Sequence, residues 1–395
     1  MAVTVEIGVT RGFVLDDPVA GVLDNTDFPL GGESFVDVSN RMLTLSTSRG
    51  KNRDLDKFQA GTLDATFNNE DRFFDPVSGT ALDIIPRAPI RMLVDGTAQF
   101  FGTINDWNYS YETSGRSKVS TTASDDFVVL ARQNILPSGV PSVETSGERI
   151  ANVLDMFTVD WPADRRNIDT GDTSVAAQPY EGQNALEYLQ LINASEQGQL
   201  FISKTGDLQF RQRSDSAPVS AGLVTFADDG SGIPFVGAGI NFDSEYIYNR
   251  AIITSPVGTA VANDDLSQIT YGVITFELET LCSTELELQD IANYVVARYA
   301  SPELRFQSIT VNIDTLSTSQ RAEVMGLEIG DVCEVSITPN GIGDPIDRYA
   351  QIFRIAHEIS PSRHDVTFQF DPLEFAPLVL DDVVFGKLNS GHIGF

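Results

Sequence analysis

Residues 49–76 read RGKNRDLDKFQAGTLDATFNNEDRFFDP, and this stretch says more about the fold than any other. Its first five residues form a basic, polar loop. Leu63, Ala65 and Phe67 then alternate with polar residues, which is the period-two pattern of a half-buried β-strand. The segment 73–76 closes the stretch as an apolar anchor before a proline turn. Because it holds no nucleophile, metal cluster or phosphate loop, we expect it to maintain a rigid shape.

The pattern RGxxRDxDxFxAG, followed by a strand and then NNxDRxFDP, resembles the N-terminal domain of minor tail proteins from phages with long, non-contractile tails. The resemblance is to the type found in phages that infect actinobacteria. It implies a component of the tail tip, the baseplate hub. The remainder of the chain resembles that family at the level of domain order.

The composition predicts a folded, acidic protein of two or three domains. Its 395 residues are 42% hydrophobic and 9% aromatic, and 56 acidic against 26 basic residues give a formal charge of −30. This balance argues against non-specific binding to DNA, RNA or anionic lipid, because neutralising phosphates needs clustered Lys and Arg. Two explanations stay open: simple solubility, or the lining of a tube through which DNA slides without sticking.

Cysteine and histidine usage predicts no metal site. Cys282 and Cys333 lie among apolar or β-type neighbours, so we expect buried free thiols, with a disulfide between them as the alternative. His357 and His364 are expected on or beside adjacent strands, and His392 follows near the end. A metal pair at His357 and His364 lacks an obvious third ligand. The sequence calls for no cofactor.

The N-terminal residues 1–7 (MAVTVEI) predict a strand and not a signal peptide, since a basic region and an apolar run are both missing. No window approaches the roughly 20 apolar residues that cross a bilayer. We therefore expect no membrane span, and synthesis in a host cytoplasm.

Two near copies of one segment stand at 13–25 (FVLDDPVAGVLDN) and 378–390 (LVLDDVVFGKLNS). Such terminal tags resemble segments of the same tail-protein family. An apolar-acidic segment with a central Gly suits a short strand or hook that docks on a neighbouring subunit, and ordinary loops are the alternative. The residues expected to make these contacts are Leu15, Asp16, Asp17, Leu380, Asp381, Asp382 and Phe385.

Residues 1–132 predict an N-terminal β-barrel domain. Strands are expected at 3–10, 35–47, 62–67, 91–94, 99–104, 106–111 and 118–123. Asp95-Gly96 is a strong hairpin turn. Many short strands separated by turn residues are typical of a barrel or sandwich.

Residues 133–215 predict an α/β insert domain. A capping box at Thr145 and Glu148 starts a helix whose expected inward residues are Ile150, Val153, Leu154 and Phe157. A second helix is expected over 184–197, with Gly198 as its stop signal, and a hairpin over 200–210. The phrase from 182 to 210 resembles the small insert of phage tail hubs.

Residues 216–372 predict a second β-barrel domain with one helix, and 373–395 a C-terminal docking tail. The helix is expected over 284–299 from a capping box at Thr284 and Glu287. Strands are expected at 223–226, 248–254, 307–313, 327–335, 349–357 and 365–370. The acidic runs 228–232 and 263–265 lack the calcium-loop frame and are expected to be solvated turns.

The predicted fold class is therefore α+β, predominantly antiparallel β, with two small barrel-like domains and an α/β insert between them. In the hub of contractile-tail phages, two such barrels per subunit give a trimer pseudo-sixfold symmetry that matches a hexameric tube. That correspondence is what the resemblance implies.

A search for chemistry finds no catalytic motif: GxSxG, HExxH, CxxC, a Walker loop and GxGxxG are all missing. The dense basic cluster is Arg49, Lys51 and Arg53, for which we expect contact with an acidic neighbouring subunit or ring partner. The alternative is pairing within the chain to Asp54, Asp56 or Glu70.

The sequence thus predicts a non-enzymatic virion protein at the tail tip: a hub that closes the tail tube. The partners that the resemblance implies are further copies of itself as a homotrimer, the distal tail or tail tube protein, the tape-measure protein, and other minor tail or receptor-binding proteins. Specific nucleic-acid binding is not expected. A peripheral, receptor-facing minor tail protein and, from another class, a secreted carbohydrate-active enzyme are the alternatives.

Overall fold

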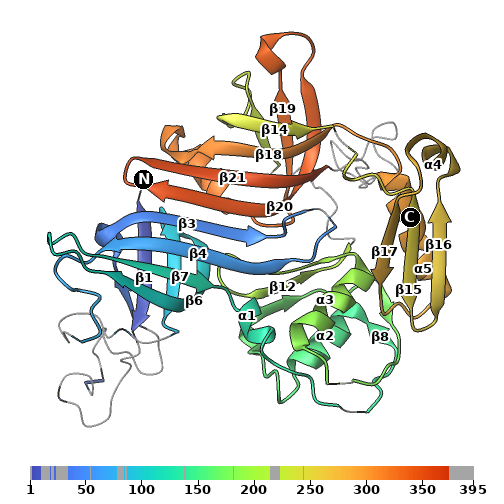
Figure 1. Cartoon of the computed structure of the whole chain (residues 1–395), viewed down its shortest axis with the longest axis horizontal. Coiled ribbons are helices and arrows are strands. Elements are labelled where there is room, and N and C mark those ends of the chain that lie inside the picture. The colour runs from blue at the N-terminus through green and yellow to red at the C-terminus, as the bar shows by residue number, and fades with distance from the viewer. Residues whose placement is uncertain are drawn as a thin grey trace.

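One continuous β-sheet of thirteen strands runs through the described part of the chain, and all but one of its strand pairs are antiparallel. The computed structural model describes residues 2–9, 18, 22–23, 34–53, 55–77, 84, 87–137, 139–180, 182–213, 223–242 and 244–372. Helices are few and lie mainly to one side of the sheet (Figure 1). The predicted fold class is confirmed.

The first part of the sheet is β1 (Val3–Val9), β2 (Ser34–Asp37), β3 (Met42–Gly50), β4 (Gln59–Asn68), β5 (Pro89–Val94), β6 (Thr97–Ser110) and β7 (Lys118–Ser124). The predicted alternation is confirmed, since Leu63 and Phe67 are fully buried in β4. The hairpin turn is also confirmed: Asp95 and Gly96 have φ of 47° and 84°, as a type I′ turn requires.

The strand expected over 35–47 is instead two strands separated by the 3-10 turn η1 (Ser39–Arg41). The Ser39 hydroxyl accepts a hydrogen bond from the Val5 N–H at 2.8 Å, which holds this turn against β1. The break lets β2 pair with β1 while β3 pairs with β4. The sequence pattern carries apolar residues on both sides of the turn and so hides it.

The middle of the chain is the α/β segment. It contains α1 (Phe127–Leu130), β8 (Glu144–Thr145), α2 (Ser146–Leu154), η2 (Ala163–Arg165), β9 (Arg166–Ile168), β10 (Ser174–Val175), α3 (Ala185–Glu196), β11 (Gln199–Ile202) and β12 (Leu208–Arg211). The capping box of Thr145 and Glu148 is confirmed. Phe157 is not inward: α2 ends at Leu154, and the side chain of Phe157 is 94% exposed.

Helix α3 and the hairpin behind it follow the prediction closely. The Asn184 side chain caps α3, and the helix ends at Gln197, whose φ of 56° is left-handed. The left-handed residue is therefore Gln197 and not Gly198. Strands β11 and β12 form the expected hairpin, to which β9 adds in parallel.

The last part of the sheet is β13 (Val224–Ala227), β14 (Gly237–Asn241), β18 (Arg305–Asn312), β19 (Val332–Ile337), β20 (Ile346–Ser360) and β21 (Arg363–Pro372). Between these strands lie η4 (Ile313–Thr315), α6 (Thr318–Gly326) and η5 (Pro339–Gly341). Helix α6 was not predicted, although a capping box of Ser317 and Gln320 marks its start.

A separate three-stranded sheet stands beside the large one and has its own core (Figure 1). Its strands are β15 (Arg250–Ser255), β16 (Gly258–Asn263) and β17 (Thr275–Glu279), with α4 (Asp265–Tyr271) and α5 (Glu285–Tyr299). Helix α5 is the predicted helix and carries the predicted capping box of Thr284 and Glu287. The expected solvated turn at 263–265 is wrong, because the Asp264 side chain caps α4. The stretch 216–372 thus contains α4, α5 and α6, not one helix.

Strand β20 joins the two parts of the large sheet, whose order is β14-β18-β21-β20-β3-β4-β7-β6-β5-β1-β2. Its first residues, 346–351, pair with β19, and 354–359 pair with β3. The change of partner falls at Phe353. Gly50 there has φ of 124°, and a Cβ on it would lie 2.1 Å from the Phe353 carbonyl oxygen, so the crossing needs glycine.

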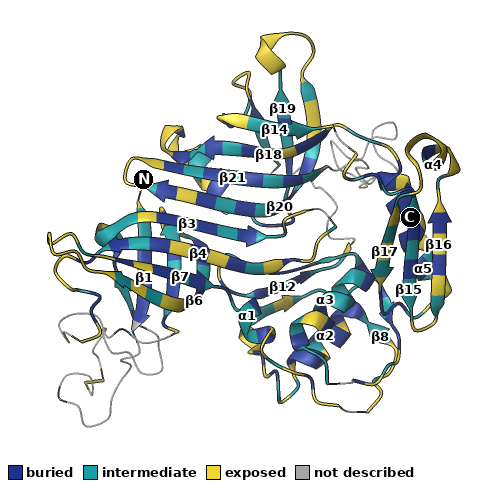
Figure 2. Cartoon of the chain, in the orientation of Figure 1, coloured by how far each residue is buried: buried dark blue, intermediate teal, exposed yellow. Residues whose placement is uncertain are grey.

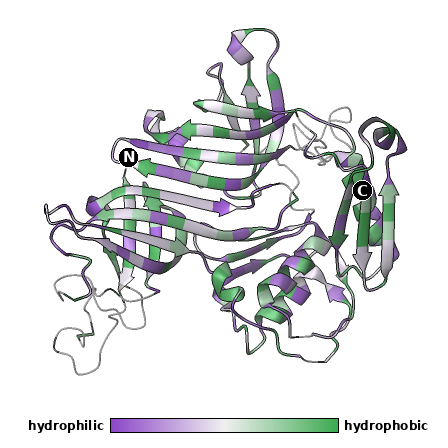
Figure 3. Cartoon of the chain, in the orientation of Figure 1, coloured by the Kyte–Doolittle hydropathy of each residue, from purple (hydrophilic) through white to green (hydrophobic). Residues whose placement is uncertain are grey.

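Burial follows the strand periodicity (Figure 2), with buried residues alternating with half-buried or exposed ones along β3, β4, β20 and β21. Figure 3 shows hydrophobic and hydrophilic bands along the same strands. One apolar core runs through both parts of the large sheet and the α/β segment. Cys282 and Cys333 are buried free thiols, as predicted. Burial raises the pKa of Cys282 to about 11 and raises that of Cys333 as well.

Within the described residues, no helix is both long enough and apolar enough to span a membrane.

Candidate functional site: a buried polar junction

Arg49 occupies an inward-facing position near the end of β3. The alternation that buries Leu45 and Thr47 also buries Arg49, whose exposed fraction is 3%. A charged side chain is rarely this buried unless it is paired. The groups that surround Arg49 are therefore the candidate functional site.

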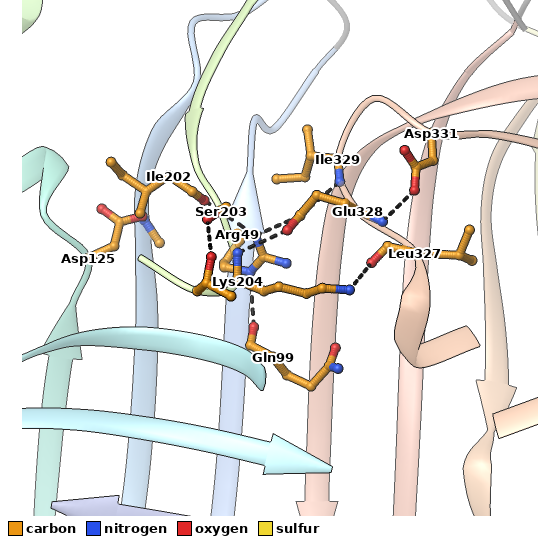
Figure 4. Close-up of polar contacts among 12 residues, drawn as sticks. Arg49, Gln99, Asp125, Ile202, Ser203, Lys204, Leu327, Glu328, Ile329 and Asp331 are labelled. Carbon is orange, nitrogen blue, oxygen red and sulfur yellow. Dashed lines mark hydrogen bonds and ion pairs between the residues drawn. The ribbon is translucent and has the colours of Figure 1, made fainter. Parts of the chain in front are cut away.

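The Arg49 guanidinium contacts three distant parts of the chain (Figure 4). Its Nε donates to the Gln99 carbonyl oxygen at 3.1 Å, and Nη1 donates to the Ile202 carbonyl oxygen at 3.3 Å. Nη1 also pairs with Glu328 Oε1 at 2.8 Å. These four residues and Lys204 are called the polar junction below: Arg49, Gln99, Ile202, Lys204 and Glu328.

Glu328 is the anionic centre of the polar junction. Besides Arg49, it accepts hydrogen bonds from the backbone N–H groups of Lys204 and Ile329, both at 2.9 Å. Burial alone would raise the pKa of Glu328, but Arg49 and these two N–H groups outweigh it and hold the pKa below its ordinary value. Glu328 is therefore an ionised, well-satisfied carboxylate.

Lys204 ties the α/β segment to the end of α6. Its Nζ donates to the carbonyl oxygens of Met325, Gly326 and Leu327 at 2.8, 2.7 and 3.1 Å. These are the last carbonyls of the helix, where a cation is favoured. Burial lowers the pKa of Lys204, and Glu328 opposes that shift. The Gln99 side chain donates to the Met325 carbonyl oxygen as well, at 3.1 Å.

Asp125 lies beside the polar junction, between β7 and α1 (Figure 4). Its carboxyl group accepts hydrogen bonds from the Gly61 N–H at 2.6 Å and the Phe127 N–H at 3.1 Å. Burial raises the pKa of Asp125 to about 7, and the two N–H groups and Arg49 only partly oppose it. The bond from Phe127 is local, whereas the bond from Gly61 comes from β4, 64 positions away, so this carboxyl group fixes the start of α1 against β4.

His357 and His364 do lie on adjacent strands, as predicted. His357 Nδ1 and His364 Nε2 are 3.0 Å apart, and both side chains are buried. Burial lowers the pKa of His357 well below its ordinary value and lowers that of His364 to about 4. One ring must donate and the other accept, so the accepting ring is neutral, and the lowered pKa values favour the neutral form of both rings.

The prediction that Arg49 contacts a neighbouring subunit is wrong. Its side chain is enclosed and is paired with Glu328 of its own chain. The intrachain partner is also not the Asp54, Asp56 or Glu70 considered from sequence. Nothing local in the sequence points to a partner 279 positions away.

Lys51 and Arg53 point elsewhere. Lys51 Nζ lies 5.6 Å from the ring centres of both Phe58 and Phe353, so this half-buried cation covers aromatic faces. Arg53 is 59% exposed and pairs with Glu245 at 2.7 Å. An exposed pair of this kind can exchange partners, and contact of Arg53 with another subunit stays a prediction.

The tag residues expected to make contacts lie outside the described residues. They are Leu15, Asp16, Asp17, Leu380, Asp381, Asp382 and Phe385.

The surface of the described residues includes two hollows of the size of an enzyme cleft. One, of about 620 Å³, lies over the seam of β3, β4, β7, β20 and β21 and is lined mainly by Ser, Thr, Asp and Glu. The other, of about 660 Å³, lies between α3 and the small sheet. A glycosidase needs a carboxylic acid of raised pKa beside a second carboxylate in such a cleft. Asp125, whose pKa burial raises to about 7, lines neither hollow.

No protein-family model matches this sequence, and no curated protein matches it. Two solved structures share the fold. The tail protein from Neisseria meningitidis MC58 superposes with a TM-score of 0.60 at 13% identity, over 93% of this chain and 95% of that one. The 43 kDa tail protein of prophage MuSo2 from Shewanella oneidensis gives 0.57 at 14% identity, over 93% and 97%. This chain therefore has the fold of these tail proteins.

The polar junction thus holds distant parts of the chain together. Its charges pair with one another and with backbone groups, except that Arg49 Nη2 is buried without a hydrogen-bond partner among the described residues. Its contacts bring together β3, β6, the β11–β12 turn and the end of α6. Sequence reasoning missed Glu328 and Lys204. Glu328 lay within the strand expected over 327–335, whereas β19 begins at Val332, and only the folded chain shows what the carboxylate binds.

Proposed function

We propose that this chain is a structural virion protein of a phage tail tip that forms the baseplate hub, closes the tail tube and anchors other tail-tip proteins. The observation that carries this proposal is the extent of the likeness to the two tail proteins. It covers more than nine-tenths of both partners in each comparison, so the whole architecture is shared. The resemblance of residues 49–76 to minor tail proteins of actinobacterial phages supports it independently.

The contacts between the parts of the chain suit a protein that must resist deformation. Strand β20 passes through both parts of the large sheet, and the polar junction fixes the α/β segment against them. Breaking a buried ion pair at such a point leaves an unpaired charge, so relative motion of the parts is costly. A tail-tip component needs this resistance to deformation.

The proposal includes assembly. The chain forms a homotrimer around the tail axis, joined to the distal tail or tail tube protein and to the tape-measure protein, and it carries other minor tail or receptor-binding proteins. The formal charge of −30 supports a place beside passing DNA, since an acidic wall does not retain phosphates. No enzymatic step is assigned to it.

Gold-labelled antibody against this chain, applied to intact phage particles and viewed by electron microscopy, tests the proposal. Label at the distal tip of the tail is the expected result. Label along the tube, or free protein in the medium with unlabelled particles, would overturn it. A symmetric reconstruction of labelled tips separates a hub from a peripheral protein, because a hub places three copies on the axis.

A further inference from the structure

Strand β14 forms one end of the large sheet. It pairs with β18 on one side, and no strand in the described part of the chain pairs with its other side. Alternate backbone N–H and C=O groups of residues 237–241 point away from β18, as they do in any edge strand. The edge therefore offers a row of hydrogen-bonding groups to an added strand.

This edge lacks the usual protection. Residues 236–242 read VGAGINF, with no charge and no proline, in a chain of which 21% is charged. Natural edges are commonly blocked by Lys, Pro or a bulge, and only a register shift at Gly239 and Ile240 is present here. Val236 and Phe242, which flank the strand, are 63% and 67% exposed. A Cβ placed on Gly237 would meet nothing within 4 Å.

The chain itself brings a candidate strand to this edge. Strand β18 pairs antiparallel with both β14 and β21, so its first residue, Arg305, lies at the C-terminal ends of both. Asn241 pairs directly with Arg305. The described chain ends at Pro372, the last residue of β21, and residues 373–395 continue from that same end of the sheet.

The lengths agree. A strand added to β14 lies three strand spacings from β21, which is about 14 Å. Residues 373–377 can span about 17 Å when extended. A strand that starts at Leu378 can therefore begin beside Asn241 and run antiparallel to β14. Residues 378–385 (LVLDDVVF) are rich in Val, Leu and Phe and free of Gly and Pro until Gly386.

One of the differences between the two copies bears on strand pairing. Pro18 stands where the C-terminal copy has Val383. Proline has no N–H and fits poorly in the middle of a paired strand. The two tags are alike in sequence, yet only the C-terminal one is suited throughout to strand addition.

We propose that residues 378–385 add as an antiparallel strand to the outer edge of β14 of the same chain. This inference does not depend on the proposed function. It assigns the C-terminal segment to the completion of a sheet, and it implies that removing the segment exposes an aggregation-prone edge.

Hydrogen exchange of the peptide 236–242 tests this, with the full chain compared with a chain that ends at Pro372. We expect exchange at least about tenfold faster after truncation, since a paired amide exchanges only on opening. Val383→Pro should have the same effect at full length. Lys387→Pro, beyond Gly386, is the matched control and should leave exchange unchanged. Equal exchange in the full and truncated chains would overturn the proposal.

A pair of cysteines separates docking within one chain from docking between chains. With Leu378 opposite Asn241, antiparallel register places Asp382 opposite Gly237. Oxidation of a Gly237→Cys, Asp382→Cys chain should give an intrachain disulfide. The same variant can be oxidised in a mixture of isotopically heavy and light chains. If the disulfides join heavy chains to light chains and intrachain disulfides are absent, the same-chain assignment is overturned.

Discussion

Arg49 and Glu328 are 279 positions apart in the sequence, yet their side chains form an ion pair of 2.8 Å, with 3% and 12% of their side-chain surfaces exposed. A pair this enclosed has lost most of its hydration, and Glu328 recovers part of that loss from two backbone N–H groups. The parts of the chain that supply these groups are therefore energetically coupled through one carboxylate.

Removing Arg49 should strongly destabilise the protein. We expect Arg49→Met to lower the free energy of unfolding by about 3–5 kcal/mol, because Glu328 is left as a buried, unpaired charge. The double variant Arg49→Met, Glu328→Gln should regain part of that loss, because Gln is uncharged and still offers an oxygen to the backbone N–H groups. Denaturant unfolding followed by tryptophan fluorescence measures both.

Arg53→Met is the matched control, since Arg53 forms an exposed pair with Glu245. Arg53→Met should lower the free energy of unfolding by less than about 1 kcal/mol. If Arg49→Met costs no more than Arg53→Met, the polar junction does not hold the parts of the chain together.

Gly50→Ala should disturb the point where β20 changes partner. The φ of 124° is strained for any residue with a Cβ, and the new methyl group would meet the Phe353 carbonyl oxygen. The backbone strain alone costs about 1–3 kcal/mol, and the clash adds to it. Thermal unfolding by calorimetry should show a lower Tm.

Gly139→Ala serves as the comparison, because a Cβ there meets nothing within 4 Å. It should leave Tm within a degree or two of the wild type, or raise it slightly. Equal Tm values for the two variants would contradict the requirement for glycine at the crossing.

The sequence predicted those features that depend on residues close together in the chain, and it missed contacts between residues far apart. The strand at Leu63, Ala65 and Phe67 and the caps at Thr145 and Thr284 are local signals, and the structure bears them out. Arg49 was expected to contact an acidic neighbouring subunit or ring partner, or a nearby acidic residue of its own chain, because it belongs to a dense basic cluster. Only tertiary pairing brings it to Glu328, and no local pattern encodes that contact.

The missed helices had weaker local signals. The box of Ser317 and Gln320 was present, but it introduces a short helix of low apolar content. At α4, Asp264 was taken for a turn residue, and its capping role shows only once the chain after it turns helical. A capping residue thus predicts a helix only where a periodic apolar stretch follows it.

The histidine pair should make stability fall in mild acid. Both folded pKa values lie below 6.5, that of His364 at about 4, so the unfolded chain binds more protons between these limits. The contribution is complete above pH 6.5 and is lost as the pH falls toward 4. Asp314, whose carboxylate accepts the His364 N–H, moderates the effect, and Arg49 and Lys204 add to it.

Unfolding free energy measured against pH for the wild type and His357→Gln checks this. The variant should show a smaller loss of stability between pH 6.5 and 4. His392→Gln changes the third histidine and acts as the reference. The explanation fails if His392→Gln reduces the loss and His357→Gln does not.

Asp125 should make the unfolding free energy fall as the pH rises, which is opposite to the effect of the histidine pair. Its folded pKa of about 7 exceeds the unfolded value near 3.9, so the folded chain binds more protons between them. The contribution of Asp125 to stability is therefore greatest below pH 4 and declines by about 1.4 kcal/mol per pH unit as the pH rises toward 7.

Asp125→Asn removes this titration and keeps the size of the side chain. Since Asn can accept only one of the two hydrogen bonds from Gly61 and Phe127, the variant should be less stable at pH 5 by about 1–3 kcal/mol. The gap to the wild type should narrow as the pH rises to 8, where the wild-type carboxylate is ionised in a buried place. Asp126→Asn changes the neighbouring carboxylate, which pairs with Arg165, and is the matched control. A gap that stays constant from pH 5 to 8 would show that Asp125 titrates as an ordinary carboxyl group.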